Sequence, residues 1–274
     1  MHIKKAWSKL RLIMLFTMFR LTILISLFAF IYGKTIHSNL GGRIVGGINT
    51  TIEDYPYQLS VEILSQNGMH VCGASLLKPN VALTAAHCTN FYEAEDLRIR
   101  AGSTIREKGG ETAHVLSICQ HPKFNEQTID CDVAILVLDR ELPLGKNIQT
   151  ITLQQEDVEV LDGAIGTVTG WGALHWQGPS PEVLQKIDLS KTNDDFCKQS
   201  YPTDITENMF CFIDPEGTGD SCSRDSGGPI VVDGVQVGVV SFGDKCNVAG
   251  VPSVYAKLSS KDISSHLKKC LADL

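Results

Sequence analysis

The chain has 274 residues, of which 43% are hydrophobic and 20% charged, a composition typical of a globular protein with a substantial core. Its formal net charge is −7, but residues 1–43 hold seven Lys or Arg and no acid, which leaves 17 basic and 31 acidic groups, a net −14, in the remainder. So acidic a domain should repel polyanions, and this argues against nucleic acid as a partner.

Residues 1–33 have the pattern of a targeting segment. Four basic residues precede an apolar run over 12–32, which Arg20 interrupts and which Gly33 follows as a small residue suited to signal cleavage. We interpret the segment as a removable secretory signal. The alternative is a signal anchor, because 21 residues can span a bilayer, although Arg20 argues against it. The protein is then expected to be secreted and extracellular, and membrane-bound only if the segment is retained.

The stretch Gly41-Gly42-Arg43-Ile44-Val45-Gly46-Gly47 follows this leader. A glycine-rich linker would explain its first two residues but not the sequence from Arg43 onward at the start of a domain. Shortly after it, Asn49-Thr50-Thr51 is the one acceptor sequence for N-glycosylation in the chain, so Asn49 is a candidate glycosylation site.

From residue 44 onward, short apolar and β-branched runs alternate with clusters of Gly, Asn, Asp and Pro. The clearest runs cover 58–63, 133–138, 166–170, 229–232, 235–242 and 253–258. This pattern predicts an all-β sandwich or barrel. Near the end, residues 261–271 have the period of an amphipathic helix whose buried side carries Ile263, Leu267, Cys270 and Leu271.

Three motifs appear in the order His, Asp, Ser. They are Thr84-Ala85-Ala86-His87-Cys88, Asp132-Val133-Ala134-Ile135-Leu136 and Gly219-Asp220-Ser221-Cys222-Ser223-Arg224-Asp225-Ser226-Gly227-Gly228-Pro229. Singly, His87 would be a buried histidine, Asp132 a residue at the start of a strand and Ser226 a turn serine. Jointly, the motifs resemble the trypsin/chymotrypsin family of serine endopeptidases, and the resemblance runs from Ile44 to the C-terminus.

The resemblance implies a chymotrypsin-like fold. That fold has two six-stranded antiparallel β-barrels, here about 44–149 and 150–258, with a C-terminal helix. It also implies that Ser226 is the nucleophile, that His87 is its general base and that Asp132 orients the imidazole, with no cofactor required. Asp130 lies two residues before Asp132, and we interpret it as a solvated neighbour.

Activation is the next expectation from the resemblance. Cleavage after Arg43 would free the α-amine of Ile44 to pair with Asp225, so the uncut chain would be a zymogen that needs an activating protease. The propeptide, 34–43, contains no cysteine and would leave after cleavage.

The family's specificity pocket falls on Asp220, Gly243 and Ser253. Asp220 matches the acid that binds a substrate Lys or Arg in trypsin-like members. Ser253 replaces a family glycine and should narrow the pocket, which would favour Lys over Arg or lower activity. The alternative is an elastase- or chymotrypsin-like preference.

Arg224 is the main departure from the family pattern, which has glycine at this position. Its backbone N–H and that of Ser226 would form the oxyanion hole, and losing one such donor costs about 2.7–4 kcal/mol. Arg224 therefore predicts reduced activity or resistance to protein protease inhibitors. It also keeps open a second class of function, a weakly catalytic or non-catalytic toxin or binding protein on a protease scaffold.

The resemblance also pairs six of the nine cysteines. The implied disulfides are Cys72–Cys88, Cys197–Cys211 and Cys222–Cys246, as suits an oxidising compartment. The pairing of Cys119, Cys131 and Cys270 stays open, and we favour Cys119–Cys270. The segment 103–113 does not match the family's acidic calcium-binding loop, so no metal is expected.

Overall fold

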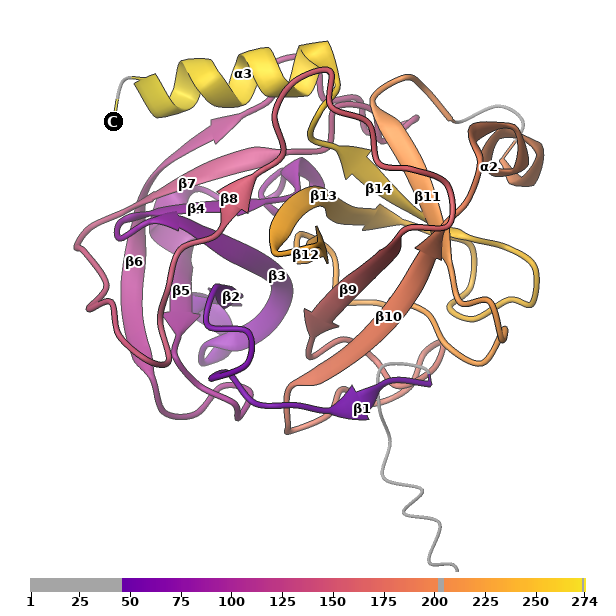
Figure 1. Ribbon diagram of the computed structural model, residues 1–274. Helices are drawn as coiled ribbons and strands as arrows, with labels where there is room; N and C mark the ends of the chain where they lie inside the picture. The colour runs from indigo at the N-terminus through magenta and orange to yellow at the C-terminus, as the bar shows by residue number, and fades with distance from the viewer. Residues whose placement is uncertain (1–45, 202–204, 273) are drawn as a thin grey trace, which may run out of the picture. The chain divides into compact units, whose positions relative to one another are not determined.

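The computed structural model describes residues 46–201, 205–272 and 274 (Figure 1). The predicted leader, the propeptide and the junction between Arg43 and Ile44 lie outside these residues. Among the helices that the structure describes, none is long and apolar enough to cross a membrane.

The first barrel is a closed sheet of six antiparallel strands in the order β2-β3-β4-β7-β6-β5. Its interior is filled by side chains such as Leu59, Ile99 and Ile135, which are 0% exposed. Glu62 is equally buried, since the guanidinium groups of Arg98 and Arg100 both donate to its carboxylate. The strands are β2 (Gln58–Ile63), β3 (Met69–Lys78), β4 (Val81–Thr84), β5 (Leu97–Ala101), β6 (Glu111–Gln120) and β7 (Ala134–Leu138).

The second barrel has the order β10-β11-β14-β13-β12-β9 and closes where β9 pairs with β10. Phe210, Phe212 and Tyr255 pack edge to face in its core. The strands are β9 (Ile165–Gly170), β10 (Gln185–Lys191), β11 (Met209–Ile213), β12 (Pro229–Val232), β13 (Val235–Phe242) and β14 (Ser253–Lys257). Two six-stranded antiparallel barrels with a C-terminal helix confirm the predicted fold class.

Two short strands lie outside the barrels. The parallel partner of β13 is β8 (Thr152–Leu153). The strand β1 (Ile48–Asn49) pairs with β10, so the chain joins the second barrel before it enters the first, although the predicted boundary assigned residues 44–149 to the first. Asn49 is exposed there, and its side-chain oxygen accepts a hydrogen bond from Gln185.

The C-terminal helix α3 (Lys261–Ala272) agrees with the sequence period, and its buried residues Ile263, Leu267 and Cys270 join the first barrel's core cluster. The sequence did not predict α2 (Asp194–Ser200), in which Asn193 caps the helix by accepting from the N–H of Phe196. The described part of the chain also contains the single-turn helices η1 (Leu64–Gln66), η2 (Ala86–Cys88) and η3 (Ala94–Asp96).

Four disulfides hold the fold together. They are Cys72–Cys88, Cys119–Cys270, Cys197–Cys211 and Cys222–Cys246. Cys119–Cys270 joins β6 to α3 across a sequence separation of 151 residues. Cys131 is a buried free thiol. Among the described residues, the groups that could hold a metal ion all include cysteines already in disulfides.

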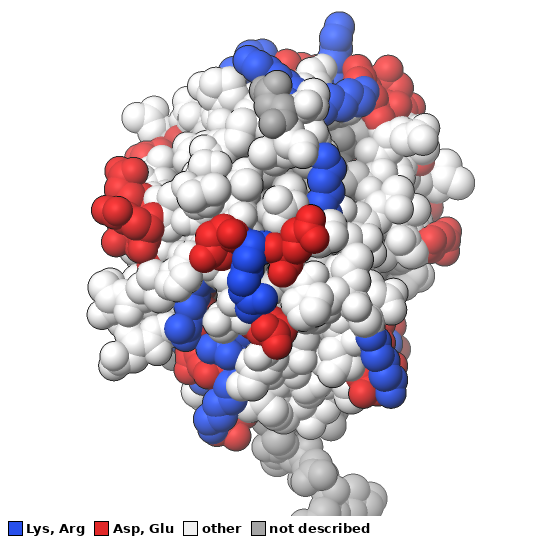
Figure 2. Space-filling view, turned by 90° about the vertical axis from the view of Figure 1, so that its left-hand side faces the viewer, with Lys and Arg blue, Asp and Glu red and all other residues white. Residues whose placement is uncertain are grey.

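Charged side chains of both signs are mixed on the surface. On the face shown in Figure 2, which lies on the first-barrel side of Figure 1, acidic and basic residues neighbour one another. Arg140 and Glu111 form an exposed ion pair. Within the described residues, the face in Figure 2 shows no continuous basic area.

Candidate active site

His87 and Asp132 are joined at one end of the first barrel. His87 lies in η2, which directly follows β4 and which the Cys72–Cys88 disulfide ties to β3. Its Nδ1 donates to Asp132 Oδ2 over 2.8 Å, and its backbone N–H donates to Oδ1 over 2.9 Å. Because the carboxylate fixes the proton on Nδ1, the Nε2 of the neutral ring keeps its lone pair for another hydrogen bond.

Asp132 is 1% exposed and has a third donor, the hydroxyl of Ser241, whose Oγ lies 2.6 Å from Oδ2. Ser241 is in β13 of the second barrel, 109 residues away in sequence. No sequence motif indicated this contact. These hydrogen bonds offset the cost of burying the carboxylate.

Ser226 lies in the loop before β12, next to the histidine. Its carbonyl accepts from the N–H of Gly73 over 2.8 Å and lies 3.6 Å from the Sγ of Cys88. Gly227 follows with a φ of +82°, and a Cβ there would approach Thr84 Oγ1 to 2.2 Å, so the loop needs glycine at this point. No hydrogen bond joins Ser226 to His87 among the described residues, and such contacts often tighten only when substrate binds.

Backbone donors are available beside Ser226. The N–H groups of Arg224 and Ser226 form no hydrogen bond within the described residues, whereas that of Asp225 donates to the Cys222 carbonyl over 2.9 Å. Arg224 has a φ of +78°, which costs a non-glycine residue on the order of 1–3 kcal/mol. The strain that arginine would bring to a glycine position is therefore present in the structure.

The carbonyl of Arg224 is held by a buried histidine. His70 Nε2 donates to it over 3.1 Å, while Nδ1 accepts from Ser60 Oγ at 2.7 Å. Burial lowers the pKa of His70 to about 3, so the ring stays neutral and keeps one donor and one acceptor. His70 thereby fixes the orientation of the peptide that follows Arg224, a role that no sequence motif indicated.

Asp225 is fully buried between this loop and β9. Its carboxylate accepts from the N–H of Gly172 over 2.8 Å and from that of Cys222 over 2.9 Å. The described residues offer it no cation. Burial raises its pKa to about 7, so the carboxyl group takes up a proton near neutral pH unless a positive charge comes close.

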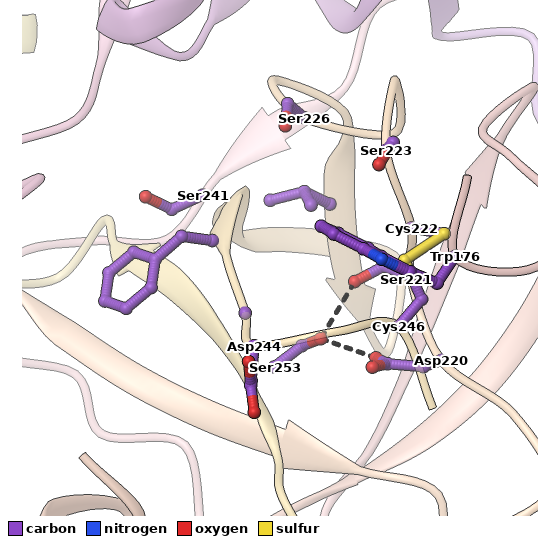
Figure 3. Close-up of a pocket in the computed structure, with 13 residues that line it drawn as sticks. Trp176, Asp220, Ser221, Cys222, Ser223, Ser226, Ser241, Asp244, Cys246 and Ser253 are labelled. Carbon is purple, nitrogen blue, oxygen red and sulfur yellow. Dashed lines mark hydrogen bonds between the residues drawn. A yellow bond between two sulfur atoms is a disulfide. The ribbon is translucent and has the colours of Figure 1, made fainter. Parts of the chain in front are cut away.

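A pocket of about 160 Å³ adjoins Ser226, with Asp220 at its base (Figure 3). Ser253 Oγ donates to Asp220 Oδ1 over 2.5 Å, and the Asn247 N–H donates to Oδ2 over 3.1 Å. Asp220 is 8% exposed, and burial raises its pKa. The pocket is lined by Trp176, Asp220, Ser221, Cys222, Ser223, Ser226, Val240, Ser241, Phe242, Gly243, Asp244, Cys246 and Ser253.

Ser253 does more than narrow this pocket. Its hydroxyl accepts from Ser221 Oγ at 3.2 Å while donating to Asp220, so a relay of two serines leads to the carboxylate. Gly243 lies beside Ser253, since a Cβ on Gly243 would lie 3.4 Å from Ser253 Oγ. Ser253 therefore already donates a hydrogen bond to one carboxylate oxygen of Asp220, the residue predicted to bind the charged end of the substrate side chain.

Asp130 requires a correction. It was expected to be a solvated neighbour of Asp132, but it is half-buried and accepts hydrogen bonds from the second barrel. Thr206 Oγ1 donates to it over 2.6 Å and Asn208 Nδ2 over 3.1 Å. Asp130 therefore joins the two barrels, and no hydrogen bond links it to His87 within the described residues.

Comparison with known proteins agrees with this geometry. The family model described as Trypsin matches residues 44–263. A vitellin-degrading protease of Bombyx mori is 39% identical over 80% of this chain and 82% of its own length. Trypsin 5G1 of Aedes aegypti is 37% identical over 80% of this chain and 82% of its own length. Trypsin delta of Drosophila melanogaster is 37% identical over 89% of this chain and 96% of its own length.

Proposed function

The chain belongs to the trypsin family of serine proteases, and on that premise we propose that it is a secreted, zymogen-activated endopeptidase that cleaves after arginine or lysine. One observation supports this most directly. The His87–Asp132 pair, the free N–H groups of Arg224 and Ser226, and the pocket containing Asp220 all surround Ser226.

In the proposed mechanism, Ser226 Oγ attacks the scissile carbonyl of a protein substrate while His87 Nε2 takes its proton. The N–H groups of Arg224 and Ser226 donate to the oxyanion, and Asp132 stabilises the imidazolium. His87 then protonates the leaving amine, which gives an acyl-enzyme and the first product. A water molecule repeats the sequence, releases the second product and restores Ser226.

Covalent labelling tests the nucleophile. A fluorophosphonate should label the activated chain once, at Ser226, because the reagent needs an activated serine next to an oxyanion hole. The other class of function, a non-catalytic protein on a protease scaffold, predicts no labelling. Activated chain without any label would reject the enzyme mechanism proposed for Ser226.

We expect a preference for lysine over arginine. A shorter lysine side chain leaves room for the Ser253 hydroxyl between its ammonium and Asp220, whereas a guanidinium has to displace that hydroxyl to reach the carboxylate. A positional-scanning peptide library would test this. A preference for small apolar or aromatic residues at the cleavage site would favour the elastase- or chymotrypsin-like alternative.

Activation should depend on the bond between Arg43 and Ile44. An Arg43→Gln chain, treated with a trypsin-like activating protease, should remain nearly inactive because the Ile44 amine is never freed to pair with Asp225. Amidase activity after treatment, together with the N-terminal sequence of the product, measures this. Full activity without a new N-terminus at Ile44 would contradict the proposal. A Lys34→Gln chain serves as the control and should activate like wild type.

The same pair predicts a pH dependence. An α-amine has a free pKa of about 7.7–8.0, and pairing with Asp225 should raise it, so activity should fall as the amine loses its proton at alkaline pH. In the uncut chain Asp225 has a pKa raised to about 7, so the folded state holds more protons than the unfolded one between the ordinary aspartate pKa and pH 7. Zymogen stability should therefore fall as pH rises through that window.

Arg224 is expected to protect the enzyme from protein inhibitors. Its exposed guanidinium donates to Ser180 Oγ over 3.1 Å, on the loop before β10, so the side chain extends over the surface beside the oxyanion loop. A Kunitz-type inhibitor should bind weakly to wild type and at least about 100-fold more tightly to Arg224→Gly, since each 1.4 kcal/mol is about tenfold in affinity.

Two variants separate the effect of the long Arg224 side chain on inhibitor binding from the effect of its backbone strain on stability. Arg224→Ala removes the long side chain but keeps the φ of +78° strained, so it should regain inhibition without regaining stability. Arg224→Gly should regain both, with an unfolding free energy about 1 kcal/mol above that of Arg224→Ala. Equal inhibition of wild type and both variants would show that the arginine does not obstruct inhibitors.

Two features support the proposal that the protein is exported. One is the predicted leader, and the other is the set of four disulfides, since disulfides persist mainly in oxidising compartments. Removal of residues 1–33 would then leave a soluble proenzyme. Glycosylation at Asn49 is proposed as well, because this residue is exposed.

A further inference from the structure

The aromatic side chain of Trp176 lies at the pocket that contains Asp220, although it comes from a loop that the sequence did not connect with substrate. Trp176 lines the pocket together with Cys222 and Ser226, and it remains 45% exposed. In Figure 3 its ring, seen nearly edge-on, extends from the side of Cys222 toward the middle of the pocket. Tryptophan combines a large apolar ring with a polar N–H and is enriched where proteins bind other molecules. The exposed ring at the edge of this pocket is therefore a candidate for contact with substrate.

The local backbone explains how the ring reaches the pocket. Ala173 N–H donates to the Ser223 carbonyl over 2.8 Å, which fixes the base of the loop beside the pocket. Gly178 N–H then donates to the His175 carbonyl over 2.8 Å, which closes a four-residue turn with Trp176 in its second position. Gln177 occupies the third position with a φ of +57°. The turn therefore carries Trp176 at its tip.

The volume of the pocket shows whether the indole ring fills the pocket or only lines it. The 160 Å³ of the pocket is measured with the indole in place, and this is far more than the roughly 10–15 Å³ that holds one water. Trp176 therefore leaves the pocket open and forms part of its side. The base is acidic through Asp220, while the side formed by Trp176 is aromatic.

Such a pocket suits a side chain with an apolar stem and a cationic end. Lysine and arginine place their methylene groups against apolar surface while the charge reaches a polar partner. The face of an indole also attracts cations more strongly than other aromatic rings do. We propose that Trp176 is a specificity-determining residue that packs against the stem of the substrate's lysine or arginine while Asp220 binds its charge. The proposal rests on the proposed preference for basic substrates.

A kinetic signature follows from this position. The stem of the substrate side chain does not change during acyl transfer, so Trp176 should stabilise the bound substrate and the transition state equally. Removing it should then raise KM and leave kcat unchanged.

The test compares the activated wild-type enzyme with its Trp176→Ala and Trp176→Phe variants on lysine and arginine peptide amides. Trp176→Ala should raise KM and the Ki of benzamidine, an aryl amidine cation, by roughly tenfold. Trp176→Phe, which keeps a ring, should raise them less. Gln177→Asn, in the same turn and able to keep a positive φ, should behave like wild type. An unchanged or lower KM for Trp176→Ala, or a tenfold loss confined to kcat, would overturn the proposal.

Fluorescence provides a readout that needs no catalysis. Benzamidine should change the tryptophan emission of an activated Ser226→Ala chain, and the change should vanish when Trp176→Phe is added. Trp171 is 3% exposed and does not line the pocket, and Trp7 lies in the leader that the activated chain lacks. If the chain cleaves no basic substrate, the proposed function fails while this titration still decides the role of Trp176. An emission change that survives Trp176→Phe, or no change at all in the Ser226→Ala chain, would overturn it.

Discussion

Replacing Ser226 or His87 with alanine should lower the kcat of the activated enzyme by about 10⁶, the loss expected when either member of such a unit is removed. Without the serine no acyl-enzyme forms, and without the imidazole no base accepts its proton. Steady-state hydrolysis of a lysine peptide amide measures the effect. The double variant should be no slower than either single one, since the two side chains act as a unit.

Matched controls distinguish this from a folding defect. Ser265→Ala and His114→Ala change the same residue types at exposed positions and should keep full activity. The catalytic variants should match wild type in secretion and thermal unfolding, because both side chains are partly exposed. A kcat within tenfold of wild type for either would reject the assignment.

The Asp132→Asn variant should have a kcat between that of wild type and those of the Ser226 and His87 variants, about 10⁴ below wild type. An asparagine that presents its NH₂ to His87 forces the wrong tautomer on the ring. The Ser241 hydroxyl and His87 Nδ1 both donate to the same oxygen of Asp132, so Ser241 helps to hold the carboxylate in position for His87. Ser241→Ala should therefore lower kcat less than Asp132→Asn does.

How much of the fold is visible in the sequence depends on how apolar each strand is. The run 58–63 coincides with β2 because all six residues are buried, and 229–232 coincides with β12. The strand β6 was not predicted, since only Ala113 and Val115 of its ten residues are buried and the others are partly or fully exposed. Its pairing with β5 and β7 arises from barrel closure, which no local pattern encodes.

The candidate site divides in the same way. The sequence marked His87, Asp132 and Ser226 as candidates because each lies within a distinctive local motif. Ser241, His70 and Trp176 carry no such motif, because their places near the candidate site depend on residues distant in sequence, as the contact of His70 with Arg224 across 154 residues does. Asp130 was misjudged for the same reason, because its partners Thr206 and Asn208 belong to the other barrel.

Asp220→Ser should lower kcat/KM for lysine and arginine substrates by about 10⁴, since a cationic side chain would enter a desolvated pocket without its counter-charge. Asp244→Ser is the matched control. It removes the same charge from an exposed residue at the same pocket, where solvent screens it, so its effect should stay below about tenfold. Equal losses in the two variants would mean that the pocket senses only general negative charge.

The protonation of Asp220 provides the sharper test of this pocket, because its carboxylate must be ionised to bind a cation. Burial raises the pKa of Asp220, while the Ser253 hydrogen bond lowers it, so Ser253→Gly should raise the pKa further. The ratio of kcat/KM for a lysine substrate to that for its neutral norleucine analogue cancels the effects of pH that are common to both substrates. That ratio should fall as pH drops through the Asp220 pKa, and its midpoint should lie at higher pH in Ser253→Gly. The same variant frees a carboxylate oxygen, so at high pH it should gain more for arginine than for lysine. A ratio that is independent of pH in both forms would show that Asp220 does not bind the substrate's charge.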